Sequence, residues 1–380
     1  ALTQEVIYNG ILKKERQVLH EKVACVIETY FQDRLSEFYE TLAFHYRNGL
    51  SWGKATQYLI RSAEKSMQRY AVEEAHLYYQ GAFDILHTTG DSTTGQQSSI
   101  LDIIVAWCFV FYFRGDFRGM HRILVDHESL ADSSGDREMA GMFFAWLGFS
   151  FYFQDEQRKS YDYVKKAEQI GEECGSTKVR AYAAVWIPYP CYELGRYEEG
   201  VASAEKGYAL AKSIGTDDYL YFKSLAGIGN NSVFLGGGAR MFEIGRELLS
   251  YAKDRSNTRC TVVGHICTGY GHSSNGDLAE AIESMKRAVE ISIDPFYSQW
   301  PRFVLGMYYI WNGQFTEADE AIRSVIAYAD EYDCKVFLRA CGPVLGAILM
   351  DRGEYARGLK MLQSGIAYFR DQGRLYWLSF

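Results

Sequence analysis

Apolar residues recur at helical spacing along most of this chain. In the clearest segment, the apolar positions 315, 318, 322, 325 and 326 share one face of a helix predicted over 315–329. Another apolar segment, 302–311, precedes it, and Gly313 stands between the two. A tight turn favours a residue without a Cβ atom at such a point. The pattern therefore predicts two amphipathic helices joined by a short turn.

This pair of helices repeats about every 40 residues. The turn residue recurs at positions 115, 155, 195, 236, 276, 313 and 353, at intervals of 40, 40, 41, 40, 37 and 40 residues. The copies around Asp155 and Gly236 are degenerate. A period in this range predicts an all-α solenoid of stacked helix pairs rather than one globular core.

Small residues recur seven positions before the turn residue, in the first helix of each pair. Five of the seven positions hold glycine, the full set being Cys108, Gly148, Pro188, Gly229, Gly269, Gly306 and Gly346. Glycine inside a helix is unfavourable by about 1 kcal/mol relative to alanine. Its recurrence predicts that the two helices of each pair approach closely there. Pro188, Pro190 and Pro343 also fall inside first helices, where proline kinks or breaks a helix.

These repeats resemble the tetratricopeptide (TPR) family. The resemblance rests on Leu305-Gly306-x-x-Tyr309-x-x-x-Gly313-x-Phe315-x-x-Ala318, and the preceding unit matches again at Gly269, Gly276, Asp277, Ala281 and Ala288. It covers residues 33–380 and implies a right-handed superhelix. The longer period is similar to TPR tails of bacterial multidomain signalling ATPases, including those joined to class III adenylate or guanylate cyclases.

The N-terminal residues extend this resemblance. Residues 1–32, including Leu12-Lys-Lys-Glu-Arg16 and the Leu19–Val23 segment, are similar to the end of the winged-helix region that follows the ATPase core in such proteins. We therefore expect a helical remnant at 1–32 and a TPR-like solenoid at 33–380. The last residues, 374–380, resemble the start of a further repeat, so we expect an excised piece of a longer protein.

In TPR proteins the first helix of each pair lines the inner, concave surface. Carrying the inner positions over to this chain implies an aromatic groove for a ligand or partner, formed by Phe109, Tyr112, Phe149, Tyr152, Tyr182, Tyr189, Tyr192, Lys223, Asn230, Tyr270, Trp300, Phe303 and Trp311. Two explanations stay open, because aromatic side chains serve either core packing or a binding surface. A groove predicts that Phe149, Tyr152, Tyr189 and Tyr192 are partly exposed.

Composition and motifs narrow the function. A net charge of −8 argues against nucleic-acid binding, which needs clustered Lys and Arg. Gly53-Lys54 precedes Ala55 where a phosphate-binding loop needs Ser or Thr, and His265, Cys267 and His272 have no fourth metal ligand nearby. No apolar run is long enough to span a membrane. The eight cysteines form no CxxC pair, which predicts buried free thiols in a reducing cytoplasm.

The sequence therefore predicts a cytoplasmic, non-catalytic sensor or scaffold region of a signalling protein, without metal or cofactor. Its partner would be a protein or peptide, supplied by another molecule or by its own polypeptide, and held in the concave aromatic groove. The alternative is a receptor for a sugar or metabolite that regulates an upstream ATPase, cyclase or transcription module.

Overall fold

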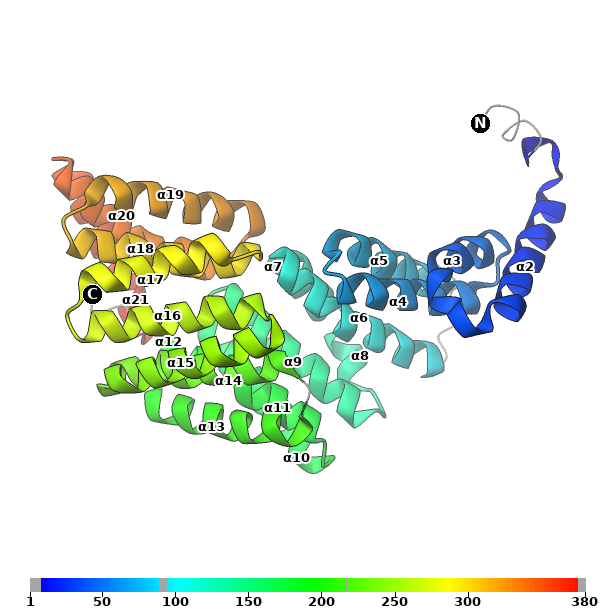
Figure 1. Ribbon diagram of the computed structural model, residues 1–380, viewed down its shortest axis with the longest axis horizontal. Coiled ribbons are helices and arrows are strands. Elements are labelled where there is room, and N and C mark those ends of the chain that lie inside the picture. The colour runs from blue at the N-terminus through cyan, green and yellow to red at the C-terminus, as the bar shows by residue number, and fades with distance from the viewer. Residues whose placement is uncertain (1–7, 89–93, 216, 375–380) are drawn as a thin grey trace. The chain divides into compact units, whose positions relative to one another are not determined.

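The structure, a computed structural model, describes residues 8–88, 94–215 and 217–374, and every element in these residues is a helix. Its contacts divide the chain into two units, Ala1–Arg114 and Gly115–Phe380. The first unit contains successive packed helices (Figure 1): α2 (Lys13–Tyr30), η1 (Gln32–Glu37), α3 (Tyr39–Asn48), α4 (Trp52–Gln68), α5 (Val72–Thr88) and α6 (Thr94–Arg114). The predicted boundary after residue 32 stays a prediction. The expectation of an excised piece rests partly on residues 1–7 and 375–380, which lie outside the described residues.

The second unit alternates first and second helices. The first helices are α9 (Arg137–Phe153), α11 (Thr177–Trp186) with α12 (Pro188–Glu193), α14 (Asp218–Ser232) with η2 (Val233–Leu235), α16 (Thr258–Ser274), α18 (Pro295–Trp311) and α20 (Lys335–Asp351). The second helices are α7 (Phe117–Asp126) with α8 (Glu128–Asp132), α10 (Gln157–Glu173), α13 (Tyr197–Ile214), α15 (Gly238–Arg255), α17 (Leu278–Ile291), α19 (Phe315–Tyr332) and α21 (Tyr355–Asp371). Each of these first helices packs on the second helix that follows it, which confirms the predicted pairs around turn residues 155, 195, 236, 276, 313 and 353. The pair predicted around residue 115 stays a prediction, because α6 and α7 belong to different units.

All seven predicted turn residues have a left-handed backbone. Their φ angles are +76, +64, +71, +78, +84, +74 and +79° at positions 115, 155, 195, 236, 276, 313 and 353. Six are glycines, which adopt this conformation at no steric cost. Asp155 is the exception, and aspartate is among the few other residues that tolerate it.

The recurring small residues lie where the helices of a pair touch. A Cβ atom added at Gly148 would lie 2.5 Å from Val164 Cγ2 and 2.7 Å from the Val164 backbone nitrogen. At Gly306 it would lie 2.5 Å from Ile322 Cδ1, and at Gly346 it would lie 3.0 Å from the Gly358 carbonyl oxygen. The predicted close approach is confirmed, because these glycines admit the neighbouring helix into the space of a side chain.

We expect Gly148→Ala to destabilise the fold by about 1–3 kcal/mol, because the added methyl group meets backbone atoms that cannot rotate away. Gly342→Ala is the matched control, since Gly342 also lies inside a first helix but an added Cβ would have no neighbour within 4 Å. That control is expected to gain up to about 1 kcal/mol from helix propensity. Urea unfolding compares the two, and equal midpoints would contradict the close approach at Gly148.

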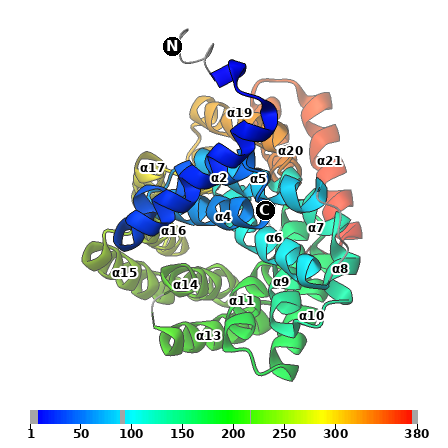
Figure 2. The same cartoon turned by 90° about the vertical axis from the view of Figure 1, so that its right-hand side faces the viewer.

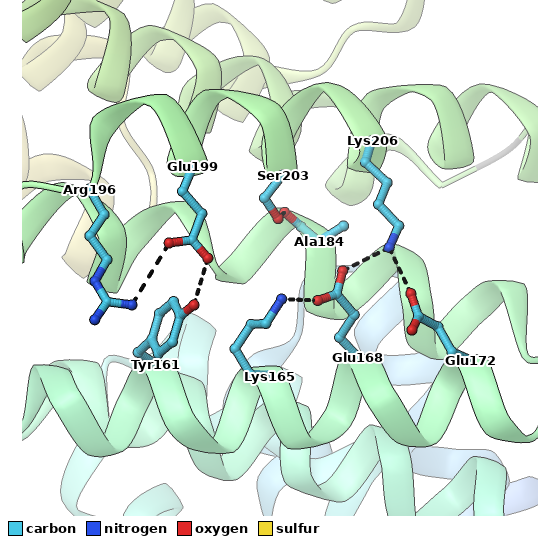
Figure 3. Close-up of polar contacts among 9 residues, drawn as sticks. All are labelled: Tyr161, Lys165, Glu168, Glu172, Ala184, Arg196, Glu199, Ser203 and Lys206. Atoms are coloured by element: carbon cyan, nitrogen blue, oxygen red, sulfur yellow. Dashed lines mark hydrogen bonds and ion pairs between the residues drawn. The ribbon is translucent and has the colours of Figure 1, made fainter.

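Proline interrupts one first helix and leaves another continuous. α11 ends at Trp186 and α12 begins at Pro188, although Ile187 between them keeps helical angles of −50° and −40°. Because Pro188 has no N–H, it cannot bond the Ala184 carbonyl oxygen, and Ser203 Oγ donates to that oxygen instead at 3.1 Å (Figure 3). The predicted interruption is therefore confirmed at Pro188. At Pro343 it is wrong, since α20 runs through this residue.

Polar side chains join the second helices α10 and α13. Lys206 Nζ lies 2.8 Å from a Glu168 carboxylate oxygen and 3.1 Å from one of Glu172 (Figure 3). Tyr161 on α10 donates to Glu199 on α13 at 2.5 Å. Such partly exposed pairs contribute little stability each, about 0–1 kcal/mol. The helix pairs are therefore held mainly by their apolar inner contacts.

The end of the second unit packs against its beginning. Phe296 on α18 contacts both Phe117 and Phe153, with ring centroids 5.5 and 5.3 Å apart. Arg118 on α7 forms an ion pair with Asp333 at 3.2 Å, at the loop between α19 and α20. Figure 2 shows α20 and α21 on the same side of the unit as α7 and α8. The row of helix pairs therefore closes on itself.

A buried ionic cluster completes this closure. Arg374, after α21, bonds both Glu193 at the end of α12 and Asp155 in the turn after α9, and Tyr368 on α21 also donates to Asp155. Arg374 and Glu193 are only 1% and 0% exposed. Burial alone would lower the pKa of Arg374, but Glu193 and Asp155 raise it above its usual value. We call Arg374, Asp155, Glu193 and Tyr368 the closure cluster.

All eight cysteines lie in described residues and carry free thiols. Six are buried as predicted, but Cys25 and Cys174 are exposed, so the expectation of burial is wrong for these two. Among the described residues, no helix is long and apolar enough to cross a membrane.

Candidate functional site

Two adjoining cavities lie among the first helices of the second unit. The larger, of about 200 Å³, is lined by Tyr192, Asn230, Val233, Phe234, Tyr270, Ser273, Ser274, Met307, Tyr308 and Trp311. The smaller, of about 50 Å³, is lined by Tyr152, Tyr189, Tyr192, Lys223, Ala226, Asn230, Val263, Ile266, Cys267, Phe296, Tyr297 and Trp300. Tyr192 and Asn230 belong to both linings, so one ligand could contact both cavities.

The repeat explains why these residues meet. Every lining residue of the larger cavity except Tyr308 stands six, three or two positions before a turn residue. In the smaller cavity, Lys223, Val263 and Trp300 each stand 13 positions before one, and Ala226 and Ile266 stand ten before. Equivalent positions of successive first helices therefore face the same space.

Most of the predicted groove residues come together here. Those lining the cavities are Tyr152, Tyr189, Tyr192, Lys223, Asn230, Tyr270, Trp300 and Trp311. Phe149, Tyr182 and Phe303 are buried elsewhere in the second unit. Phe109 and Tyr112 lie on α6 in the first unit, where Phe109 is half-buried and Tyr112 is buried.

The predicted exposure of the aromatic residues is wrong for three of four. Phe149, Tyr152 and Tyr192 are only 1, 3 and 5% exposed, whereas Tyr189 is half-buried. Rings of successive first helices cover one another, and Phe149 on α9 stacks on Trp186 of α11 at 4.8 Å between ring centroids. Part of the aromatic stripe is therefore core, and Tyr152 and Tyr192 are buried side chains that nevertheless line a cavity.

Polar and aromatic groups face each other across the larger cavity. Trp311 is 50% exposed at its edge, 5.5 Å from the Tyr308 ring. Trp300 Nε1 donates to Tyr270 Oη at 3.0 Å, which fixes the orientation of both rings. Asn230 is half-buried, and within the described residues its side-chain amide makes no hydrogen bond. An amide offers two donor hydrogens and one acceptor oxygen to a ligand.

Several residues that line the cavities were not predicted, because their side chains are small or aliphatic rather than aromatic. Ser273 and Val233 stand three residues before the turn, as the predicted Tyr192 does, and Ser274 stands two residues before it, as the predicted Trp311 does. The same offsets applied without regard to side-chain type would have found them. Tyr297 and Phe296 lie in the first turn of α18, beyond the positions considered, and nothing in the repeat pattern identifies them.

No protein-family model matches this chain. No curated protein matches its sequence either.

Solved structures of similar fold do exist. The Rap protein complexed with competence and sporulation factor is 14% identical, with a TM-score of 0.61 over 85% of this chain and 95% of that chain. NprR in complex with its cognate peptide NprX is 12% identical, with a TM-score of 0.58 over 82% of this chain and 87% of that chain. At these identities the likeness shows the fold alone, and it confirms an all-α, TPR-like domain.

A STAND signal-transduction ATPase with a tetratricopeptide repeat sensor, from Pyrococcus horikoshii, also matches. It is 15% identical over 90% of this chain and 55% of that chain, with a TM-score of 0.43. This score is too low to support an argument about function.

Proposed function

We propose that the second unit is a non-catalytic sensor that binds a peptide segment across the two cavities. The observation that carries the proposal is the joined lining, in which Tyr192 and Asn230 face both cavities. Four successive first helices, α12, α14, α16 and α18, supply most of these walls. A ligand held there contacts several repeats at once, so its affinity depends on the spacing of these repeats.

The chemistry of the lining suits a peptide. Apolar and aromatic walls accept apolar side chains, and a few fixed polar groups set the orientation. Asn230 can pair with a peptide bond, since its amide donates and accepts as a backbone amide does. The Rap protein and NprR, whose folds are similar, were solved in complex with competence and sporulation factor and with the cognate peptide NprX, respectively. The segment would come from a partner protein or from the same polypeptide.

The size of the cavity favours a second candidate, a sugar or small metabolite. About 200 Å³ is below the range of about 300–1,000 Å³ that is usual for ligand pockets. Tyr270, Tyr308 and Trp311 offer aromatic faces to a ring of that size. A receptor of this kind would also be non-catalytic.

The signal would be a change in the superhelix. A ligand shifts an equilibrium only by its differential affinity for the two states, so it must contact helices that move relative to one another. We propose that the first helices around the two cavities are such helices. We propose that the change acts on further parts of a signalling protein, such as an ATPase or a transcription module. The link to nucleotide cyclases has no support in the comparisons and stays a prediction from the sequence.

Asn230→Ala is expected to weaken peptide binding about tenfold, or about 1.4 kcal/mol, because a bound backbone amide loses its partner. Peptides are obtained by affinity selection from a synthetic heptapeptide pool and identified by mass spectrometry. Dissociation constants then follow from tryptophan fluorescence, since Trp300 and Trp311 line the cavities. Asn48→Ala is the control, because Asn48 is also half-buried but lies on α3.

The same assay separates the two candidates. Selected peptides that bind the Asn230 variant as tightly as the unchanged chain would contradict the proposed site. If the pool yields no binder and a saccharide panel shifts the melting temperature, the peptide proposal fails and the small-molecule receptor replaces it.

A further inference from the structure

A lysine lies at the inner end of the site, surrounded by aromatic rings. Lys223 on α14 is 2% exposed and lines the smaller cavity. Its Nζ atom lies 4.5 Å from the ring centroid of Tyr189 and 5.1 Å from that of Phe149. The rings of Tyr297 and Tyr219 follow at 5.6 and 5.7 Å. An ammonium group is attracted to ring faces within about 6 Å.

Burial acts against the charge of this amine. Removal from water lowers the pKa of Lys223 well below its ordinary value of 10.5. The titratable groups that line the same cavity from other helices are Tyr152, Tyr189, Tyr192, Cys267 and Tyr297. Burial raises the pKa of Cys267 to about 12 and also raises those of Tyr152 and Tyr189, so these three stay protonated near neutral pH.

We propose that Lys223 anchors a carboxylate of the bound ligand, which enters the smaller cavity while the rest of the ligand occupies the larger one. The proposal rests on the proposed peptide-binding function. The carboxylate would be the C-terminus of a peptide or the side chain of an aspartate or glutamate, because both present the same group to the amine.

The energetics favour this occupant. Forming a buried ion pair usually requires the desolvation of two charges, and this cost often exceeds the attraction. Here the amine is desolvated before the ligand arrives, so only the carboxylate loses its water on binding. A charge-assisted hydrogen bond is about twice as strong as a neutral one. Binding would therefore restore the charged form of Lys223 and take up a proton.

The cavity dimensions agree with a small group. A volume of about 50 Å³ has room for a few non-hydrogen atoms, since a water molecule in the liquid occupies about 30 Å³. Asn230 and Tyr192 line both cavities, so the chain leading to the carboxylate would pass between them. An aromatic side chain would be too large for the smaller cavity and would stay in the larger one.

The test uses the peptides selected from the heptapeptide pool, on the full chain. Each is made with a free C-terminus, with a C-terminal amide, and with each Asp or Glu changed to Asn or Gln. Loss of one particular carboxylate is expected to weaken binding at least tenfold. The same loss should have no effect in Lys223→Met, where a flexible apolar side chain of similar length replaces the amine. Amidation and side-chain replacement identify which carboxylate is bound.

Proton uptake provides an independent measurement on the unchanged chain. Calorimetry at neutral pH in two buffers of different ionisation enthalpy should show up to one proton taken up per peptide, and none for the peptide form that lacks the anchored carboxylate. This readout applies even if Lys223→Met does not fold.

The outcomes separate the two proposals. Tight, Asn230-dependent binding of peptides whose carboxylates are all dispensable would overturn the anchor and leave the peptide-binding function intact. The anchor is also overturned if a carboxylate matters equally in the unchanged chain and in Lys223→Met, or if binding takes up no proton. Absence of any peptide binder overturns both proposals.

Discussion

Arg374→Ala is expected to destabilise the second unit by about 3–5 kcal/mol, because it leaves two buried carboxylates without their cation. Arg374 bonds both Asp155 and Glu193, and its guanidinium group is almost fully enclosed. The effect should appear first as release of α21, which the closure cluster holds against the turn after α9. Urea unfolding measures the loss, and limited proteolysis detects the released helix.

Two further variants make this prediction specific. Arg370→Ala alters an exposed residue of the same helix, so we expect a change within about 0.5 kcal/mol. Replacing Arg374 by Met together with Asp155→Asn and Glu193→Gln removes the charges and should recover part of the stability, since asparagine also tolerates the left-handed backbone at position 155. A single Arg374→Ala variant as stable as Arg370→Ala would show that the cluster does not hold the closure.

Lys223→Met is expected to stabilise the protein at neutral pH and to remove a pH dependence. Because folding lowers the pKa of Lys223, the unfolded chain binds more protons than the folded chain at pH values between the lowered pKa and the ordinary pKa of 10.5. The free energy of unfolding of the unchanged protein should therefore rise with pH in this window, by about 1.4 kcal/mol per pH unit. At pH values below this window, the destabilisation by the buried amine of Lys223 is constant. Above the window it vanishes, because the amine is neutral in both the folded and the unfolded state.

The measurement is the difference in free energy of unfolding between the two proteins as a function of pH. Other titrating groups contribute equally to both and cancel. Lys178→Met serves as the control, because it makes the same replacement at an exposed lysine on α11. A difference for Lys223→Met that does not vary with pH would mean that water reaches the amine in the folded protein.

The repeat made most of the fold predictable. Each helix pair needs a residue with a left-handed backbone at its turn and a small residue where its two helices touch. These requirements are local, so the residues recur at a fixed period and identify the helix pairs. The same period places Asn230 and Tyr270 at equivalent positions, each six residues before its turn residue, which is why several groove residues could be predicted.

The closure was not predictable in this way, because its residues are far apart in the sequence. Arg374 lies 219 residues from Asp155, and no repeat pattern relates them. Asp155 was read as a degenerate turn, although its side chain serves the closure cluster. The burial of Phe149 and Tyr192 was not predicted either, because rings of the next first helix cover them: Trp186 stacks on Phe149, and Phe234 lies against Tyr192.

Closure also changes how such a protein can evolve. An open solenoid gains or loses repeats readily, since each repeat contacts only its neighbours. In this unit, Arg374 meets its partners only if the number of helix pairs between them is correct. Insertion or deletion of one 40-residue repeat would displace α21 from Asp155 and Glu193, so duplication, the usual route by which repeat proteins grow, is closed to this unit.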